Sequence, residues 1–258
     1  MPLQEFLNAQ VYLYLLCFVR VGTALTIMPG VGDGFVPMRL RLFFSLGLTA
    51  VVFPVLYNYL PQEVPTMARF LNLIFAEFLI GLFMGMIGRI LAMALDTAGM
   101  IISMQSGLAS AQMFNPAMQG QGSLFGVFLT LSGILLMFVT DMHHMMLAGF
   151  YNSYTAFPVG NYLGTGAMLD IIAKAVGQAF LVGFQMATPF LLVITVLYVA
   201  MGLLTRLMPN IQVFMIAMPA QILLAFVIMS AVIGAGLLFW LSWFQRGIDF
   251  YYQIGSGG

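Results

Sequence analysis

Two uncharged stretches in the second half of the chain limit what it can fold into more than any other feature. Residues 175–205 and residues 207–245 contain no Lys, Arg, Asp or Glu. A membrane-spanning helix needs about 20 apolar residues, because the hydrocarbon core of a bilayer is about 30 Å thick. Both stretches exceed that length, and prolines lie within or beside them. They predict long membrane helices that are broken, or that extend into a protein environment.

Four shorter apolar runs precede these two: 11–28, which contains Arg20; 42–60; 70–88, which contains Glu77; and 124–140. Charged residues make up only 6% of the chain, against about 25% in soluble domains. So few charges cannot cover the surface of a soluble protein of this size. The sequence therefore predicts an all-α integral membrane protein of about six hydrophobic, partly broken helices, arranged as helical hairpins.

The composition also excludes several classes of function. Eight basic and eight acidic residues balance to a net charge of zero, so no basic field for nucleic acid is expected. A lone cysteine, Cys17, rules out a disulfide framework or a cysteine metal cluster. Ser106-Gly107 lacks the preceding glycine of a nucleophile elbow, because Met104 stands there. We expect no catalytic residues, no cofactor and no enzymatic activity.

One string, Gly-Val-Gly-Asp at 30–33, matches the motif of intramembrane aspartyl proteases. That chemistry needs two carboxylates that share a proton inside the membrane. Asp33 is followed by Gly34 and Pro37, and its nearest candidate partner is Asp96, expected at a helix end. We therefore interpret the string as a turn and keep the protease as an alternative hypothesis.

A second polar cluster, Asp141-Met142-His143-His144, opens the longest polar connector, 141–174. Metal ligands on a helix share a face at spacings of three or four residues. Adjacent histidines are expected to point in different directions, so the pattern indicates a polar helix end and no metal site.

Arg20, Glu77 and Arg89 lie in or near apolar runs. An ionisable group at membrane depth normally has a partner and is a functional candidate. Arg20 and Glu77 are a possible pair, and exchanging the two charges should then restore assembly that either single change weakens. The alternatives are an ion pair that locks two helices, a contact with another subunit, and a transport pathway.

Small residues at helical spacing predict close helix packing. Gly81 and Gly85 are four residues apart, and so are Gly122 and Gly126. Glycines at this spacing allow two helix backbones to approach closely in an apolar medium.

The connector 105–123 is uncharged, yet rich in Gln, Gly, Ser and Ala. Irregular backbone at membrane depth is tolerated only where protein buries it or where it lines a cavity. A pore-lining or pore-blocking loop fits this requirement, and Met113 and Met118 could form a soft constriction. A plain surface loop is the alternative.

Several short blocks occur in order along nearly the whole chain. They are Arg20-Val21-Gly22, Val36-Pro37, Arg39-Leu40-Arg41, Ile80-Gly81, Asn115-Pro116, Asp141-x-His143-His144, Phe157-Pro158-Val159-Gly160, Ala187-Thr188-Pro189, Arg206-Leu207-Met208-Pro209 and Gln212-Val213-Phe214. This ordered set resembles the FliR family of flagellar export-gate membrane proteins and its injectisome relatives. Two positions depart from the pattern, with Met142 where glycine is expected and Asn115 where aspartate is expected.

The resemblance implies a structural and gating subunit of the flagellar type III export gate, without catalysis of its own. It implies a single copy in a hetero-oligomer with FliP and FliQ, FlhB as a further partner, and unfolded proteins as substrates. The expected location is the bacterial inner membrane, in the flagellar basal body. The alternative from another class is a stand-alone small-solute transporter, which would need internal symmetry and charges that converge at mid-membrane.

The resemblance also implies a division of the single membrane domain. Residues 1–174 would form a FliP-like half with a pore plug at about 105–123, residues 175–250 a FliQ-like hairpin, and residues 251–258 a tail. The candidate plug residues are Gln105, Ser106, Gly107, Met113, Phe114, Asn115, Pro116, Met118, Gln119 and Gly120. The candidate buried or assembly charges are Arg20, Glu77, Arg89 and Arg206.

Overall fold

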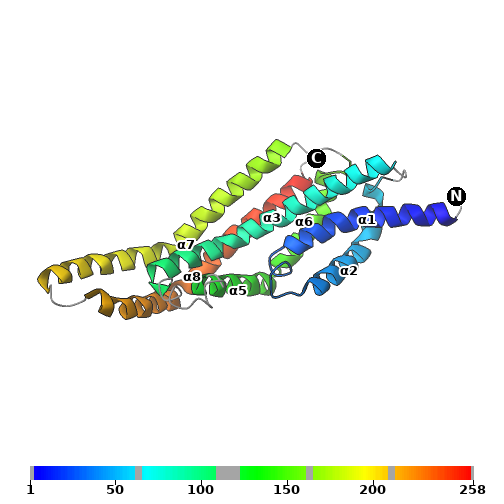
Figure 1. Cartoon of the computed structure of the whole chain (residues 1–258). Helices are drawn as coiled ribbons and strands as arrows, with labels where there is room; N and C mark the ends of the chain where they lie inside the picture. Colours follow the sequence, from blue (N-terminus) through cyan, green and yellow to red (C-terminus); the bar gives the residue numbers. More distant parts are fainter. Residues whose placement is uncertain (1–2, 62–65, 109–122, 161–164, 209–212, 257–258) are drawn as a thin grey trace. The chain divides into compact units, whose positions relative to one another are not determined.

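The computed structural model describes residues 3–61, 66–108, 123–160, 165–208 and 213–256, and over these ranges its regular structure is helical, with no strand (Figure 1). This confirms the predicted all-α class. The elements are α1 (Leu3–Ile27), α2 (Met38–Leu56), the short 3-10 helix η1 (Tyr57–Tyr59), α3 (Met67–Gln105), α5 (Leu124–Val139), α6 (Met142–Ala156), α7 (Thr165–Leu207) and α8 (Val213–Ser256).

Among the described residues, five helices are long and apolar enough to cross a membrane: α1, α2, α3, α7 and α8. Helices α5 and α6 pass the same test only together, and the chain bends by 74° between them. Counting that bent pair gives up to six spans, so the prediction of about six hydrophobic, partly broken helices is confirmed. The chain is an integral membrane protein.

Helix α6 lies where the sequence suggested a polar connector, so that interpretation of residues 141–156 was wrong. Met142, Met146, Phe150 and Tyr154 recur every four residues and are all buried. A stripe at this spacing lies on one face of a helix. Burial of this stripe stabilises the helix despite polar residues such as Asn152 on its other faces.

Pro189 and Pro219 do not end the long helices. Helix α7 continues through Pro189 and helix α8 through Pro219. Proline is tolerated within membrane helices because neighbouring groups satisfy the freed carbonyls. With 43 and 44 residues, each helix is about 65 Å long at about 1.5 Å per residue. Each therefore reaches well beyond a hydrocarbon core of about 30 Å.

The described chain forms two compact units. Unit 1 consists of Met1–Leu91, Phe138–Ala175 and Gln245–Gly258, and unit 2 consists of Ala92–Met137 and Val176–Phe244. In unit 1, α1 lies beside α2 (Figure 1). Its core includes Leu16, Leu25 and Ile80, and the core of unit 2 includes Leu95 and Phe190.

Glycines bring helix backbones together in both units, as the sequence predicted for Gly81, Gly85 and Gly126. In unit 1, a Cβ on Gly81 would meet the Arg20 carbonyl oxygen, and one on Gly85 would lie 2.8 Å from the Ala24 carbonyl oxygen. Helix α3 therefore packs closely on α1. In unit 2, a Cβ on Gly99 would meet the backbone of Gly126, so α3 and α5 touch there. Gly122 lies outside the described residues.

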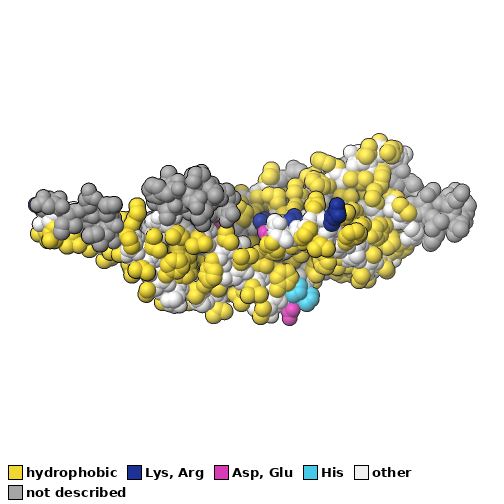
Figure 2. Space-filling view, turned by 60° about the horizontal axis from the view of Figure 1, so that its bottom comes forward, with side chains coloured by type: hydrophobic (Ala, Val, Ile, Leu, Met, Phe, Trp, Pro, Cys, Tyr) yellow, Lys and Arg dark blue, Asp and Glu magenta, His cyan; other side chains and the backbone are white. Residues whose placement is uncertain are grey.

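Apolar side chains dominate the surface (Figure 2). The degree of burial differs between helices: 67% of the apolar window of α3 is buried, against 22% for α7 and 11% for α8. Large exposed apolar faces require an apolar surrounding, either lipid or another protein. The apolar window of α2 is 17% buried, so α2, α7 and α8 all depend strongly on what surrounds the chain.

Candidate functional site

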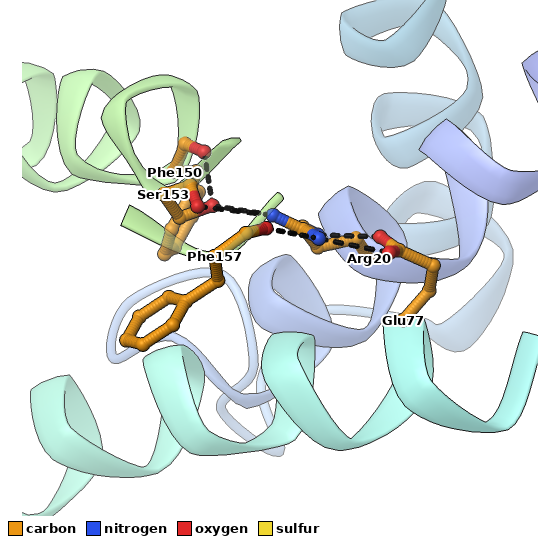
Figure 3. Close-up of polar contacts among 5 residues, drawn as sticks. All are labelled: Arg20, Glu77, Phe150, Ser153 and Phe157. Atoms are coloured by element: carbon orange, nitrogen blue, oxygen red, sulfur yellow. Dashed lines mark hydrogen bonds and ion pairs between the residues drawn. The ribbon is translucent and has the colours of Figure 1, made fainter. Parts of the chain in front are cut away.

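Arg20 on α1 is the centre of a buried polar cluster in unit 1 (Figure 3). Its Nε donates to Glu77 Oε2 at 2.5 Å and its Nη2 donates to Glu77 Oε1 at 2.8 Å. This two-pronged contact matches the planar guanidinium to the planar carboxylate of α3. The ion pair that the sequence suggested between Arg20 and Glu77 is therefore present in the structure, and its role in assembly stays a prediction.

Arg20 also binds the C-terminal turn of α6. Its Nη1 donates to the carbonyl oxygen of Ser153 at 3.1 Å and to its hydroxyl at 3.4 Å. Its Nη2 donates to the Phe157 carbonyl oxygen at 2.9 Å, and the Tyr154 ring lies 4.0 Å from Cζ. Five hydrogen bonds match the five N–H groups of a guanidinium. Because Arg20 is fully engaged, the cluster serves to lock α1, α3 and α6 together.

The connector after α1 holds a second ion pair. Asp33 is 7% exposed, and its carboxylate binds Arg89 of α3 and accepts a 2.6 Å hydrogen bond from the Gly30 amide. Arg41 donates to the Asp33 carbonyl oxygen at 2.5 Å. Both carboxylate oxygens have partners, so Asp33 stabilises a turn. This geometry supports the turn interpretation over that of a proton-sharing catalytic carboxylate.

Arg206 differs from the other three candidate charges. It is exposed in the last turn of α7, where the negative end of the helix dipole stabilises a cation. The structure buries Arg20 and Glu77 and leaves Arg89 half-buried. Burial of Arg206 in an assembled complex stays a prediction.

The candidate plug begins at the end of α3. Gln105 is the last residue of the helix, and the buried Ser106 hydroxyl donates to the Ser103 carbonyl oxygen at 3.1 Å. Gly107 has a φ of +74°, and a Cβ there would lie 3.2 Å from Gln221 Oε1. An L-amino acid is strained in this backbone conformation, so glycine suits the turn. The remaining candidates, Met113, Phe114, Asn115, Pro116, Met118, Gln119 and Gly120, lie outside the described residues.

Gln221 was missed by the sequence analysis. It lies on α8 two residues after Pro219 and is only 5% exposed. A polar amide inside an apolar helix normally binds another element of the protein. The available signal was a glutamine in the middle of an uncharged apolar run. The structure places it beside the first residues of the candidate plug.

At the bend between α5 and α6, the structure brings Asp141, His143 and His144 together. One possible ligand atom from each lies within 4.8 Å of the other two. The expectation that the adjacent histidines would point apart was therefore wrong. Their ring centroids are 4.0 Å apart, and Asp141 has a left-handed backbone with a φ of 59°. Both histidines lie in the first turn of α6, so their rings meet through the orientation of the side chains on a helical backbone.

Comparison with known proteins places the chain in a family. The model of bacterial export proteins, family 1, matches residues 11–247. The flagellar biosynthetic protein FliR of Caulobacter vibrioides is 33% identical over 94% of this chain and 96% of that protein. FliR of Bacillus subtilis is 28% identical over 84% of each chain. The Yop proteins translocation protein T of Yersinia pestis is 29% identical over 81% of this chain and 80% of its own. The chain belongs to family 1 of the bacterial export proteins.

Proposed function

We propose that the chain is a structural and gating subunit of the flagellar type III export gate. It assembles as a single copy with FliP and FliQ, beside FlhB, in the bacterial inner membrane at the flagellar basal body. Unfolded proteins pass through the gate, and the chain itself carries out no catalysis. The observation that carries the proposal is the similarity to FliR proteins along nearly the full length of both chains.

The exposure of the long helices supports a role inside a larger complex. Val196 and Val199 on α7 and Leu223 and Val227 on α8 are each more than 60% exposed. Lipid can cover only about 30 Å of a helix that is about 65 Å long. Partner subunits would cover the remaining apolar surface, because its exposure to water is unfavourable.

The proposed gating mechanism is steric. The uncharged segment that follows Gly107 fills the pore at rest and moves aside when substrate is driven through. Small uncharged groups hold neither anionic nor cationic segments strongly, so passage does not depend on the substrate's sequence. Deleting residues 109–119 should increase ion leakage through the assembled gate. Unchanged leakage, with assembly intact, would contradict the plug.

A solute transporter fits the described residues less well. The buried charges Arg20, Glu77 and Asp33 are engaged in ion pairs, and transport of a polar solute needs polar groups that converge at its path. A groove of about 540 Å³ is lined mainly by apolar residues of α1, α2 and α3, such as Phe18, Leu42 and Phe75. This groove suits an apolar group and offers little to an ionic solute.

Co-purification tests the assembly. The chain, carrying an affinity tag, is expressed with FliP and FliQ, and the detergent-solubilised particle is weighed by native mass spectrometry. The proposal predicts one copy of this chain among several copies of the two partners. Parallel expression with each partner alone shows which contacts form independently. A lone monomer or homodimer, with both partners present and stable, would overturn the proposal.

A further inference from the structure

The bend between α5 and α6 carries three side chains of metal-ligand type that the proposed export role does not use. Asp141, His143 and His144 each place a ligand atom within 4.8 Å of the others. Two of the three are the chain's only histidines, and the third is an aspartate. In Figure 2 the histidines (cyan) lie at the surface beside an acidic side chain (magenta).

The carboxylate of Asp141 faces the histidines instead of capping the helix. Asp141 is the N-cap residue of α6, yet its side chain makes no capping hydrogen bond, although aspartate is among the best N-cap residues. Its Oδ1 lies 3.3 Å from Nδ1 of His144. The left-handed backbone of Asp141 is uncommon for a residue other than glycine. Local geometry therefore directs an acidic oxygen toward the ring pair.

His143 has an unsatisfied ring nitrogen. Its Nδ1 is covered and has no hydrogen-bond partner among the described residues, while the ring packs against Phe138 at a centroid distance of 4.9 Å. A buried polar atom without a partner among the described residues is uncommon, so this nitrogen is a candidate to bind a ligand from outside the chain. This observation is independent of the proximity of the three side chains.

We propose that Asp141, His143 and His144 bind one divalent transition-metal ion of the zinc type. Two imidazoles and a carboxylate form a ligand set found in zinc sites, with water at the fourth position. Zinc–nitrogen bonds of about 2.0 to 2.1 Å require the ligand atoms to approach to about 3.3 Å. Asp141 and His144 are 74% and 68% exposed, so their side chains can rotate by this amount. Imidazole ligands disfavour the hard ions Mg²⁺ and Ca²⁺.

Isothermal titration of the full-length chain in detergent with Zn²⁺ tests the site. The affinity tag must contain no histidine, so that the chain's own two histidines are the only imidazoles present. We expect one ion per chain, and a loss of affinity of roughly tenfold or more in His143→Ala, in His144→Ala and in Asp141→Asn. Asp170→Asn, which changes another exposed aspartate of unit 1, should bind as the unchanged chain does. Mg²⁺ should give no comparable heat.

Histidine-selective ¹⁵N labelling gives a readout that does not depend on the variants folding. Only two imidazoles contribute signals, and Zn²⁺ should shift the ring nitrogens of both at one equivalent. Absence of Zn²⁺ binding, binding that both histidine variants retain, or a shift confined to one imidazole would each overturn the shared site.

Discussion

The two compact units bury different kinds of groups. Unit 1 buries the charges Arg20, Glu77 and Asp33 in ion pairs. Among the described residues of unit 2, the buried polar side chains are the uncharged Ser103, Ser106 and Gln221. Unit 1 thus includes directional contacts that fix one arrangement of α1, α3 and α6, whereas unit 2 depends on close packing of small and apolar residues.

One membrane chain can in this way combine a fixed scaffold with an adaptable surface. Hydrogen-bonded ion pairs at membrane depth are costly to break and tolerate little displacement. Apolar contacts are non-directional and can be exchanged for contacts with lipid or with another subunit. In our proposal, partner subunits cover the exposed faces of α7 and α8, most of whose residues belong to unit 2.

Glu77→Gln should have the largest effect, because it leaves the Arg20 charge buried without its carboxylate. Loss of one partner of a buried pair costs about 3–5 kcal/mol. Thermal unfolding of the solubilised chain measures it. Lys174→Gln is the matched control in unit 1, because its pair with Asp170 is exposed and contributes about 0.5 kcal/mol or less.

Exchanging the charges of Arg20 and Glu77 should restore little of this stability. A glutamate at position 20 would face the carbonyl oxygens of Ser153 and Phe157, which now accept hydrogen bonds from Arg20. The prediction from the sequence, that the exchange restores assembly, treats the pair as isolated from α6. If the exchanged chain unfolds at the temperature of the unchanged one, the contacts with α6 contribute nothing and unit 1 is less directional than we infer.

Gly99→Ala should separate α3 and α5 in unit 2. The added Cβ would meet the backbone of Gly126, which cannot move as a flexible side chain can. We expect a loss of about 1–3 kcal/mol, the usual range for overpacking. Gly234→Ala is the matched control, since a Cβ there meets nothing within 4 Å. Equal unfolding temperatures for the two variants would show that unit 2 does not depend on close glycine packing.

Gly107→Ala should cost about 1–2 kcal/mol, because a side chain is strained at positive φ. The new Cβ would also lie 3.2 Å from Gln221 Oε1. Gly107→Asn should be milder, since asparagine tolerates the left-handed region better. Unfolding of the two variants can be compared in one denaturant series. An alanine variant as stable as the unchanged chain would argue against a fixed turn at the start of the plug.

Asp33→Asn should have the smallest effect on global stability, about 1 kcal/mol or less, because Arg89 is 41% exposed and water screens the pair. Its local effect should be clearer. The amide of Gly30 donates to Asp33, so hydrogen exchange at Gly30 should accelerate, while exchange in the middle of α1 stays unchanged. Unaltered exchange at Gly30 would mean that the carboxylate does not hold the turn.

The length of the apolar runs predicted most of the fold, because the need for about 20 apolar residues per span acts locally along the chain. Helix α6 was missed since its buried stripe, including Met146 and Phe150, is interrupted by polar residues. The pairing of Arg20 with Glu77 could be suggested because buried charges need partners. The acceptors at Ser153 and Phe157 are backbone carbonyls. Because every residue has a backbone carbonyl, the sequence could not indicate which ones bind Arg20.

Photo-crosslinking from unit 2 tests whether partner subunits cover α7 and α8. A benzophenone amino acid is placed at Val196 or Leu223, which are 69% and 67% exposed on α7 and α8, and the chain is expressed with and without FliP and FliQ. We expect protein crosslinks at both positions only when the partners are present. Crosslinks to lipid alone, at both positions and in a gate shown to be assembled, would contradict this expectation.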